Sequence, residues 1–197
     1  MLERCHIAGT IEAGTDEAGR GCIAGPVYAA AVILPDDFCC PELNDSKKLT
    51  VKVREKLREI IINKAVCWCV ASASPEEIDR INILNASILS MHRALDGLSV
   101  RPEHIIVDGN RFKPYKDIPY TCFVKGDARY ASIAAASILA KTFRDDYMKE
   151  AAIQYPQYGW MQNCGYPTEA HREAVRRYGL TPLHRKTFRI LPDPVLF

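Results

Sequence analysis

Short runs of apolar residues, bounded by glycine-rich or polar segments, predict the β-strands of this chain. Five such runs cover residues 7–15, 27–34, 66–73, 104–107 and 120–124. The first two are joined by the glycine-rich segment 18–26, which favours an antiparallel pair. The fourth run stops at Asp108-Gly109, and the fifth stops before Lys125-Gly126-Asp127.

Helical patterns separate these strands. Thr50 is a suitable N-cap for a helix that extends to about Lys64. Ser74, Pro75 and Glu77 have the spacing of a capping box with proline in the first turn. Further helices are expected over residues 84–98, 131–154 and 168–179.

This order of elements predicts the fold class. Strands that come first and then alternate with helices are typical of an α/β domain, with a central mixed sheet flanked by helices. We expect this main domain to cover residues 1–155. A C-terminal helical extension over residues 156–197 is expected to pack on it.

Composition narrows the class of protein. The chain has 197 residues, 48% hydrophobic and 25% charged, as in an ordinary soluble globular protein. No apolar run approaches the ~20 residues that cross a bilayer, and the N-terminus lacks the apolar segment of a signal peptide. We therefore expect a cytoplasmic protein without membrane contact. Because nothing in the sequence favours an oligomer, we expect a monomer.

Cysteines and net charge add little by themselves. The eight cysteines include no C-x-x-C pair, so we expect free and mostly buried thiols instead of a zinc site. A net charge of +2 does not by itself indicate nucleic-acid binding. The last third of the chain is nevertheless rich in basic residues, which predicts either a face for a polyanion or a solvated surface. These residues are His171, Arg172, Arg176, Arg177, His184, Arg185, Lys186 and Arg189.

Four carboxylates share a position at or just beyond the end of a predicted strand. Asp16 and Glu17 follow the first strand, Asp108 ends the fourth, and Asp127 lies just past the fifth. Residues at strand ends of an α/β sheet can converge on one crevice. Carboxylates supply the oxygen ligands that Mg²⁺ or Mn²⁺ prefers, and bound cations relieve their mutual repulsion. Taken singly, each acid could equally be a turn, capping or exposed residue.

The surroundings of these acids resemble one known family. The segment Gly14-Thr15-Asp16-Glu17-Ala18-Gly19-Arg20-Gly21 resembles the signature of bacterial ribonuclease HII, a type 2 ribonuclease H. The resemblance continues in order through nearly the whole chain. Further matching blocks are Leu43–Leu49, Val107–Asn110, Lys125–Asp127, Ala131–Lys141, Gly165–Thr168 and Leu183–Arg185.

The resemblance implies a ribonuclease H-like fold with a C-terminal helical extension. It implies a metal-dependent endoribonuclease that cleaves the RNA strand of RNA–DNA hybrids and cuts 5′ of ribonucleotides embedded in duplex DNA, leaving 3′-hydroxyl and 5′-phosphate ends. Asp16, Glu17, Asp108 and Asp127 would be the catalytic, metal-binding set in a two-metal-ion mechanism. Asp145 is an alternative to Asp127, although we expect Asp145 to form a structural ion pair within its helix.

The resemblance also assigns substrate contacts. A protein separates RNA from DNA by reading the 2′-hydroxyl, and the Gly19-Arg20-Gly21 backbone can approach a sugar closely. Tyr166 would place its hydroxyl on the 2′-hydroxyl and its ring on the next sugar. Further expected contacts to the nucleic-acid backbone come from Asn44, Ser46 and Lys47. We expect His184 and Arg185 to approach the metal site or the DNA backbone.

Two departures from the family pattern bear on this recognition. Cys22-Ile23 stands where Pro-Leu is common, and Pro167 stands where Gly is common. Neither removes a predicted ligand, and the preference for an RNA–DNA junction is the property that they affect.

Other interpretations remain open at this stage. A catalytically silent binding module of the same fold would have lost a carboxylate, and all four are present. A nucleotide phosphotransferase would carry a phosphate loop such as G-x-x-x-x-G-K-[ST], which the sequence lacks. Ribonuclease HIII resembles this domain but usually adds an N-terminal domain, for which the first motif at residue 16 leaves no room.

Overall fold

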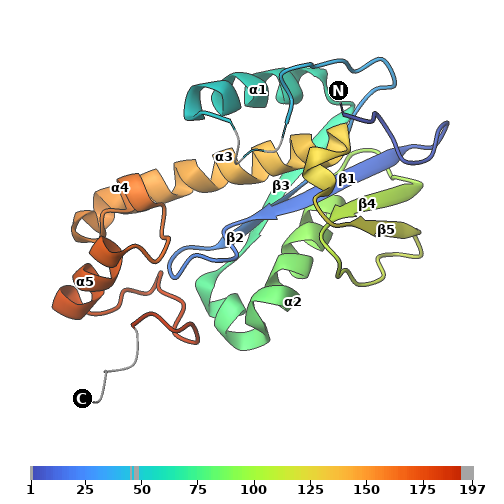
Figure 1. Ribbon diagram of the computed structural model, residues 1–197. Helices are drawn as coiled ribbons and strands as arrows, with labels where there is room; N and C mark the ends of the chain where they lie inside the picture. Colours follow the sequence, from blue (N-terminus) through green and yellow to red (C-terminus); the bar gives the residue numbers. More distant parts are fainter. Residues whose placement is uncertain (1, 45, 47–48, 192–197) are drawn as a thin grey trace.

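Five strands form one mixed sheet in the computed structural model, which describes residues 2–44, 46 and 49–191 (Figure 1). The strands are β1 (Glu12–Ala18), β2 (Val27–Ile33), β3 (Cys67–Ala73), β4 (His104–Asp108) and β5 (Tyr120–Phe123). Their order across the sheet is β3-β2-β1-β4-β5. Pairs β1–β2 and β2–β3 are antiparallel, whereas β1–β4 and β4–β5 are parallel. The predicted α/β class with a central mixed sheet is confirmed.

Helices cover both faces of this sheet. The helices are α1 (Val51–Lys64), α2 (Pro75–Asp96), α3 (Ala131–Gln154), α4 (Trp160–Asn163) and α5 (Glu169–Tyr178), with 3₁₀ turns η2 (Gly126–Ala128) and η3 (Pro156–Tyr158). Helix α3 lies across β1 and β2 on one face, with α1 beyond it, and α2 covers β2 and β3 on the other (Figure 1). Central strands are therefore buried between helical layers.

The predicted helix starts have the expected caps. The side chains of Thr50 and Ser74 accept hydrogen bonds from the backbone N–H groups of Val53 and Glu77, respectively. The Glu77 side chain in turn accepts the Ser74 backbone N–H, which completes the capping box. Helix α2 is kinked at Asn82, whose φ of 65° lies in the left-handed region. The Asn82 side chain accepts the Asn85 N–H, so a second helical segment starts there, as the separate helix predicted over 84–98 requires.

Small residues allow α3 to lie directly on the sheet. A Cβ atom at Gly14 of β1 would come 2.3 Å from the backbone carbonyl carbon of Ser132 in α3. Alanines at 134, 135 and 136 in α3, and Ala30 in β2, are fully buried in one cluster at this interface. The close contact fixes the height of α3 above the end of β1, where the predicted carboxylates lie.

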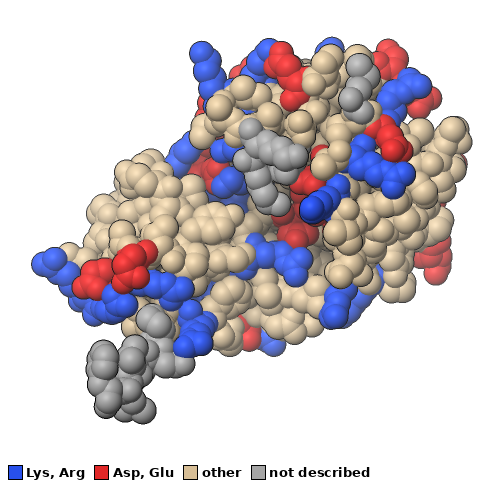
Figure 2. All heavy atoms as spheres, viewed as in Figure 1, with Lys and Arg blue, Asp and Glu red and all other residues tan. Residues whose placement is uncertain are grey.

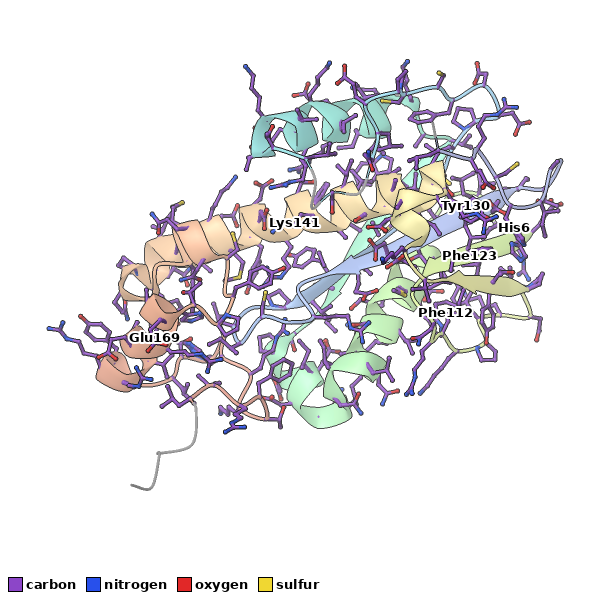
Figure 3. All side chains as sticks on the ribbon, in the orientation of Figure 1. His6, Phe112, Phe123, Tyr130, Lys141 and Glu169 are labelled. Atoms are coloured by element: carbon purple, nitrogen blue, oxygen red, sulfur yellow. The ribbon has the colours of Figure 1, made fainter. Side chains whose placement is uncertain are left out.

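The chain beyond α3 packs on the second half of that helix. Trp160 and Val175 join Met148 of α3 and Ile23 of the loop after β1 in one buried cluster. At the opposite end of the sheet, His6, Phe123 and Tyr130 form an aromatic group beside β5 (Figure 3). Ring centroids of His6 and Phe123 are 4.9 Å apart.

Three expectations need correction. The first strand begins at Glu12 instead of Ile7, because residues 7–10 turn at Gly9 (φ +78°) and the Thr10 hydroxyl donates to the Ile7 carbonyl. Strand β1 also runs further than predicted, so Asp16 and Glu17 lie inside it, paired with Ala30 and Ala29 of β2.

The third correction concerns the cysteines. All eight are free thiols, as expected, but only Cys22 and Cys67 are buried. The exposed ones, Cys5 and Cys39, lie outside helices and strands. Within the described part of the chain, no helix is both long and apolar enough to span a membrane.

Candidate active site

Asp16 and Asp108 lie at the ends of neighbouring parallel strands. Thr15 of β1 pairs with Val107 of β4, so the next step along both strands brings Asp16 beside Asp108. Adjacent strands are about 4.8 Å apart, and residues in register face the same side of the sheet. For Asp16 this side is occupied by α3, from which the Ser137 hydroxyl bonds to its carboxylate.

The environment of Asp16 opposes its ionisation. Burial is the largest cause, and the charges of Glu17 and Asp108 add to it, so the pKa of Asp16 is raised well above its ordinary value. Hydrogen bonds from Ser137 and from the Glu17 N–H (2.7 Å) act in the opposite direction. The fold therefore holds carboxylates together against their mutual repulsion.

Glu17 follows Asp16 in the strand and so points to the other face. Its side chain is 10% exposed and pairs with Arg20 at 3.1 Å. It lines a cavity of about 160 Å³ together with Asp108, Asn110 and Arg111, and it also borders a second cavity next to Asp16. Glu17 thus connects the two predicted strand-end acids.

Asp127 approaches this edge of the sheet from the turn η2. The N–H of Gly126 donates to Asp108 Oδ1 at 2.7 Å, and the next residue, Asp127, is 5% exposed. Lys125 starts the turn with a left-handed φ of 60°. The alternative acid, Asp145, lies on α3 and pairs with Lys141 at 2.7 Å, which is the ion pair within the helix that the sequence predicted.

The donor set fits a divalent cation by its chemistry. Asp16, Glu17 and Asp108 interact electrostatically, and all three offer the hard oxygen atoms that Mg²⁺ and Mn²⁺ bind. Among the described residues, however, no three Asp, Glu, His or Cys side chains converge closely enough to hold a metal ion without adjustment. Binding of a cation would require these carboxylates to move closer to one another, and its charge would offset their mutual repulsion.

The cavity beside Asp16 and Glu17 has a volume of about 230 Å³. Of the residues predicted to bind substrate, it is lined by Gly19, Arg20, Gly21, Ser46 and Tyr166. Figure 2 shows acidic side chains within a hollow near the centre of the molecule, with basic side chains around it. Asn44 is exposed and does not line this cavity. Lys47 lies outside the described residues.

Two buried arginines hold the glycine-rich loop that forms one wall. The guanidinium of Arg144 donates to the carbonyls of Pro26 (3.1 Å), Ala24 (3.1 Å) and Cys164 (2.9 Å). Arg185 donates to the carbonyls of Gly25 (2.9 Å) and Arg20 (3.0 Å). These bonds link the loop to α3 and to the C-terminal segment.

The expectation that His184 and Arg185 approach the metal site or the DNA is therefore wrong for this structure. Arg185 is fully buried and His184 is 1% exposed. Arg185 binds backbone carbonyls, and His184 contacts His171 inside the C-terminal segment. A run of basic residues in a sequence usually indicates a solvated surface, whereas here the Arg185 guanidinium donates to carbonyl groups within the protein.

Two cavity residues on α3 were missed from the sequence. Ser137 bonds to Ser46 at 2.9 Å between hydroxyl oxygens, and Lys141 (Figure 3) lies 5.7 Å from the centre of the Tyr166 ring. A signal was present, because Ser137, Lys141 and Asp145 recur every four positions along this helix. Polar residues at that spacing share one face of the helix.

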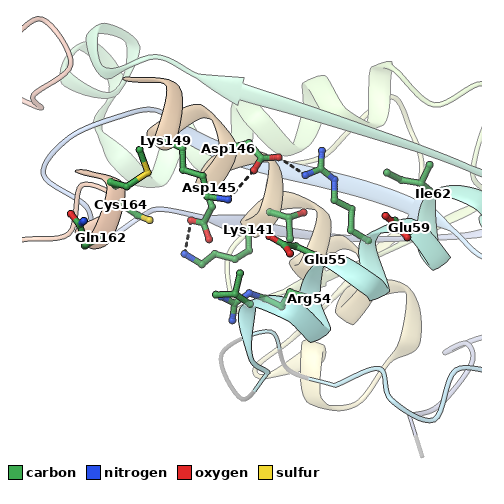
Figure 4. Close-up of a pocket in the computed structure, with 14 residues that line it drawn as sticks. Arg54, Glu55, Glu59, Ile62, Lys141, Asp145, Asp146, Lys149, Gln162 and Cys164 are labelled. Carbon is green, nitrogen blue, oxygen red and sulfur yellow. Dashed lines mark hydrogen bonds and ion pairs between the residues drawn. The ribbon is translucent and has the colours of Figure 1, made fainter. Parts of the chain in front are cut away.

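A larger cavity of about 560 Å³ lies between α1 and α3 (Figure 4). Its charged residues are largely paired with each other: Lys141 with Asp145, and both Arg58 and Lys149 with Asp146. Paired charges have little capacity left for a ligand. We therefore place the candidate site in the smaller cavity, which adjoins the strand-end carboxylates.

Comparisons with known proteins agree with this arrangement. A family model for ribonuclease HII matches residues 13–191. A ribonuclease HII from Parabacteroides distasonis is 65% identical over 185 residues, which cover 94% of this chain and 93% of the relative.

Solved structures give the same result. The ribonuclease H2 of Pyrococcus horikoshii OT3 superposes with a TM-score of 0.75 at 29% identity, covering 91% of this chain and 94% of that one. The ribonuclease HII of Archaeoglobus fulgidus, in a complex with PCNA, also gives 0.75, at 26% identity, covering 94% and 98%. The matched family model, the high identity over nearly the full length and the shared fold establish that the chain belongs to the ribonuclease HII family.

Proposed function

We propose that this endoribonuclease, which as a member of the ribonuclease HII family hydrolyses the RNA strand of RNA–DNA hybrids, also cuts 5′ of ribonucleotides embedded in duplex DNA. The products would carry 3′-hydroxyl and 5′-phosphate ends. The observation that carries the proposal is the contact between two features: the buried Asp16 with the partly buried Glu17 near the end of β1, and a cavity bordered by Gly19, Gly21 and Tyr166.

Asp16, Glu17, Asp108 and Asp127 are the proposed catalytic set, and they would hold divalent cations, Mg²⁺ or Mn²⁺, in a two-metal-ion mechanism. When bound, such cations neutralise charge at the scissile phosphate and lower the pKa of water at the site. The chain itself keeps the carboxylates in place through the Gly126 N–H on Asp108 and the Ser137 hydroxyl on Asp16. The Ser137 hydrogen bond favours the ionised form of Asp16, which binds a cation.

Recognition of the ribonucleotide is assigned to the walls of the cavity. Gly21 has open space where a Cβ atom would be, so its backbone can approach a 2′-hydroxyl. Tyr166 is 41% exposed and carries its ring and hydroxyl beside this backbone. Arg20, Ser46, Asn44 and Lys47 are proposed to contact phosphates and sugars.

We assign residues 1–155 to the catalytic domain and residues 156–197 to a helical extension that packs on it. The buried contacts among Trp160, Met148 and Ile23 support this assignment, because they join the extension to α3 and to the glycine-rich loop. The extension thereby carries Tyr166 to the rim of the cavity.

The test uses three labelled duplexes of the same sequence: a uniform RNA–DNA hybrid, a DNA duplex with one ribonucleotide, and an all-DNA duplex. Each is incubated with Mg²⁺, Mn²⁺ or EDTA, and the product ends are mapped. We expect cleavage of the first two only, 5′ of the single ribonucleotide, and none with EDTA. Binding of the hybrid and the single-ribonucleotide duplex without cleavage under any condition would instead indicate a catalytically silent binding module.

A further inference from the structure

A chain of hydrogen bonds inside the C-terminal segment ends on the backbone of Tyr166. His184 Nδ1 accepts the Thr181 N–H at 2.9 Å, so the proton of the neutral His184 ring must be on Nε2. That N–H faces His171 Nε2 at 3.2 Å. The indole N–H of Trp160 donates to the same nitrogen at 2.9 Å.

These contacts fix the tautomer of His171. Its Nε2 accepts from two donors and therefore carries no proton, so the ring proton is on Nδ1. His171 Nδ1 lies 2.9 Å from the Tyr166 carbonyl oxygen, to which it donates. The ring thus has a definite direction, with two donors on one side and the Tyr166 carbonyl on the other.

The network is sealed from solvent. His171 and Trp160 are fully buried, and His184 is 1% exposed. Burial lowers the pKa of both histidines, in keeping with neutral rings. A protonated His171 would place an N–H against the N–H groups of Trp160 and His184, so the observed arrangement excludes the charged form.

The Tyr166 backbone is held at several points around this bond. Its carbonyl also accepts the Thr168 N–H at 2.8 Å, and its own N–H donates to the Asn163 carbonyl at 2.8 Å. The preceding residue, Gly165, accepts the N–H of Ile23 from the glycine-rich loop at 2.9 Å. Among these contacts, His171 is the side chain that acts on Tyr166 directly.

We propose that His171 is a positioning residue for Tyr166, which sets the height of the tyrosine ring over the substrate cavity and so supports discrimination of a single ribonucleotide in DNA. The inference rests on the proposed role of Tyr166. His171 itself is buried and does not touch substrate; it acts through the Tyr166 carbonyl alone.

Two substitutions of His171 separate positioning from support of the fold. The amide nitrogen of Asn can take the place of Nδ1, so His171→Asn keeps a donor to Tyr166 and loses the acceptor for Trp160 and His184. His171→Gln extends to the place of Nε2, so it keeps that acceptor and loses the donor to Tyr166. Both variants should be less stable than wild type, but only His171→Gln loses the hydrogen bond to the Tyr166 carbonyl.

The measurement is kcat/KM on a DNA duplex with one ribonucleotide, divided by kcat/KM on a uniform RNA–DNA hybrid. We expect Tyr166→Ala and His171→Gln to lower this ratio by roughly tenfold, and His171→Asn to leave it within about threefold of wild type. Melting temperatures of the two His171 variants serve as the control for folding. ¹⁵N NMR should find His171 protonated at Nδ1 and His184 at Nε2.

Two outcomes would overturn the inference separately from the proposed function. A ratio unchanged in His171→Gln, while Tyr166→Ala lowers it, would leave His171 with a purely structural role. The opposite tautomers in the NMR spectrum would remove the bond on which the inference depends. If Tyr166→Ala itself left the ratio unchanged, the proposed role of Tyr166 would fail, and the role of His171 with it.

Discussion

Asp16 and Asp108 are neighbours on two parallel strands, one register step beyond the pair formed by Thr15 and Val107. Parallel pairing places these side chains on the same face, where the charge on Asp108, after burial and the charge on Glu17, raises the pKa of Asp16. The sheet register therefore places two carboxylates close enough to repel each other, and a bound cation would relieve this repulsion. This relationship underlies the first prediction.

Replacing Asp16 with Asn should stabilise the protein without metal and remove its response to metal. The substitution removes a buried charge from a repulsive pair but keeps an oxygen for the Glu17 N–H. A gain of ~1 kcal/mol would raise the melting temperature by 2–4 °C for a chain of this size. Mg²⁺ at a hundred times its Kd should stabilise wild type by about 2.7 kcal/mol. A variant that melts lower than wild type in EDTA would contradict this electrostatic account.

Two glycines of the recognition loop should respond differently to alanine. Gly19 has a φ of +94°, and its Cβ atom would lie 2.1 Å from Arg144 Nε, so Gly19→Ala should cost about 2–4 kcal/mol of folding free energy. Gly21 has no atom within 4 Å of its Cβ position, so Gly21→Ala should change stability by less than about 0.5 kcal/mol.

Gly21→Ala should affect activity although it leaves stability unchanged. The methyl group of Gly21→Ala projects where we expect the sugar to approach, so KM for the single-ribonucleotide duplex should rise roughly tenfold at unchanged stability. Urea unfolding and steady-state kinetics on both variants check these expectations. Wild-type KM in Gly21→Ala would argue against a close backbone approach to the ribonucleotide.

The pair of buried histidines predicts how stability depends on pH. Burial, together with an electrostatic interaction with the neighbouring His171 ring, lowers the pKa of His184 to about 4. The unfolded chain takes up this proton near pH 6.5, whereas the folded protein does not, so stability falls as pH drops. The loss due to His184 should be about 2 kcal/mol between pH 7 and 5. The free energy of unfolding, measured by urea titration at several pH values, should fall more steeply with decreasing pH in wild type than in His184→Gln. An equal pH dependence in the two proteins would mean that His184 is protonated in the folded state.

The ion pair between Glu77 and Arg93, which lines neither of the two cavities beside the carboxylates, predicts an effect on stability without an effect on kinetics. The Arg93 guanidinium and the Ser74 N–H lower the pKa of Glu77 to about 2. A depressed carboxyl pKa stabilises the fold above the unfolded value of about 4.3, and the effect is lost as pH falls towards 2. Allowing for partial solvent exposure of the pair, Glu77→Gln should cost about 1–2 kcal/mol at pH 7.

The exposed neighbour Glu76 is the matched control for Glu77. Glu76→Gln lies in the same first turn of α2 and should change stability by less than about 0.5 kcal/mol. Both variants should cleave hybrids at the wild-type rate. Equal stability of the two variants would show that the capping box and Arg93 contribute nothing beyond the charge of the first turn.

The sequence predicted elements whose signals are local. Caps at Thr50, Ser74 and Thr168 act within four residues, and they mark the starts of α1, α2 and α5. Helix α3 has no side-chain cap, and its extent follows from composition and helical spacing. The start of β1 was missed because the turn at Gly9 interrupts an apolar run without an obvious change in composition.

Contacts between distant segments could not be predicted from residue patterns alone. That Arg144 and Arg185 bind the carbonyls of the glycine-rich loop depends on how α3 and the C-terminal segment pack. The direction of the His171 ring likewise depends on three separate segments that meet only in the fold. Tertiary hydrogen bonds to backbone carbonyls leave no sequence motif.

The central claim is that the carboxylates at the ends of β1 and β4 and in η2 perform the cleavage. Its most direct test is single-turnover cleavage of a duplex with one ribonucleotide by Asp16→Asn, Asp127→Asn and Asp145→Asn, with Mg²⁺. We predict a rate loss of roughly 100-fold or more for the first two and a rate near wild type for Asp145→Asn, whose carboxylate pairs with Lys141. Wild-type cleavage by Asp16→Asn, or loss of cleavage in Asp145→Asn but not in Asp127→Asn, would contradict the account.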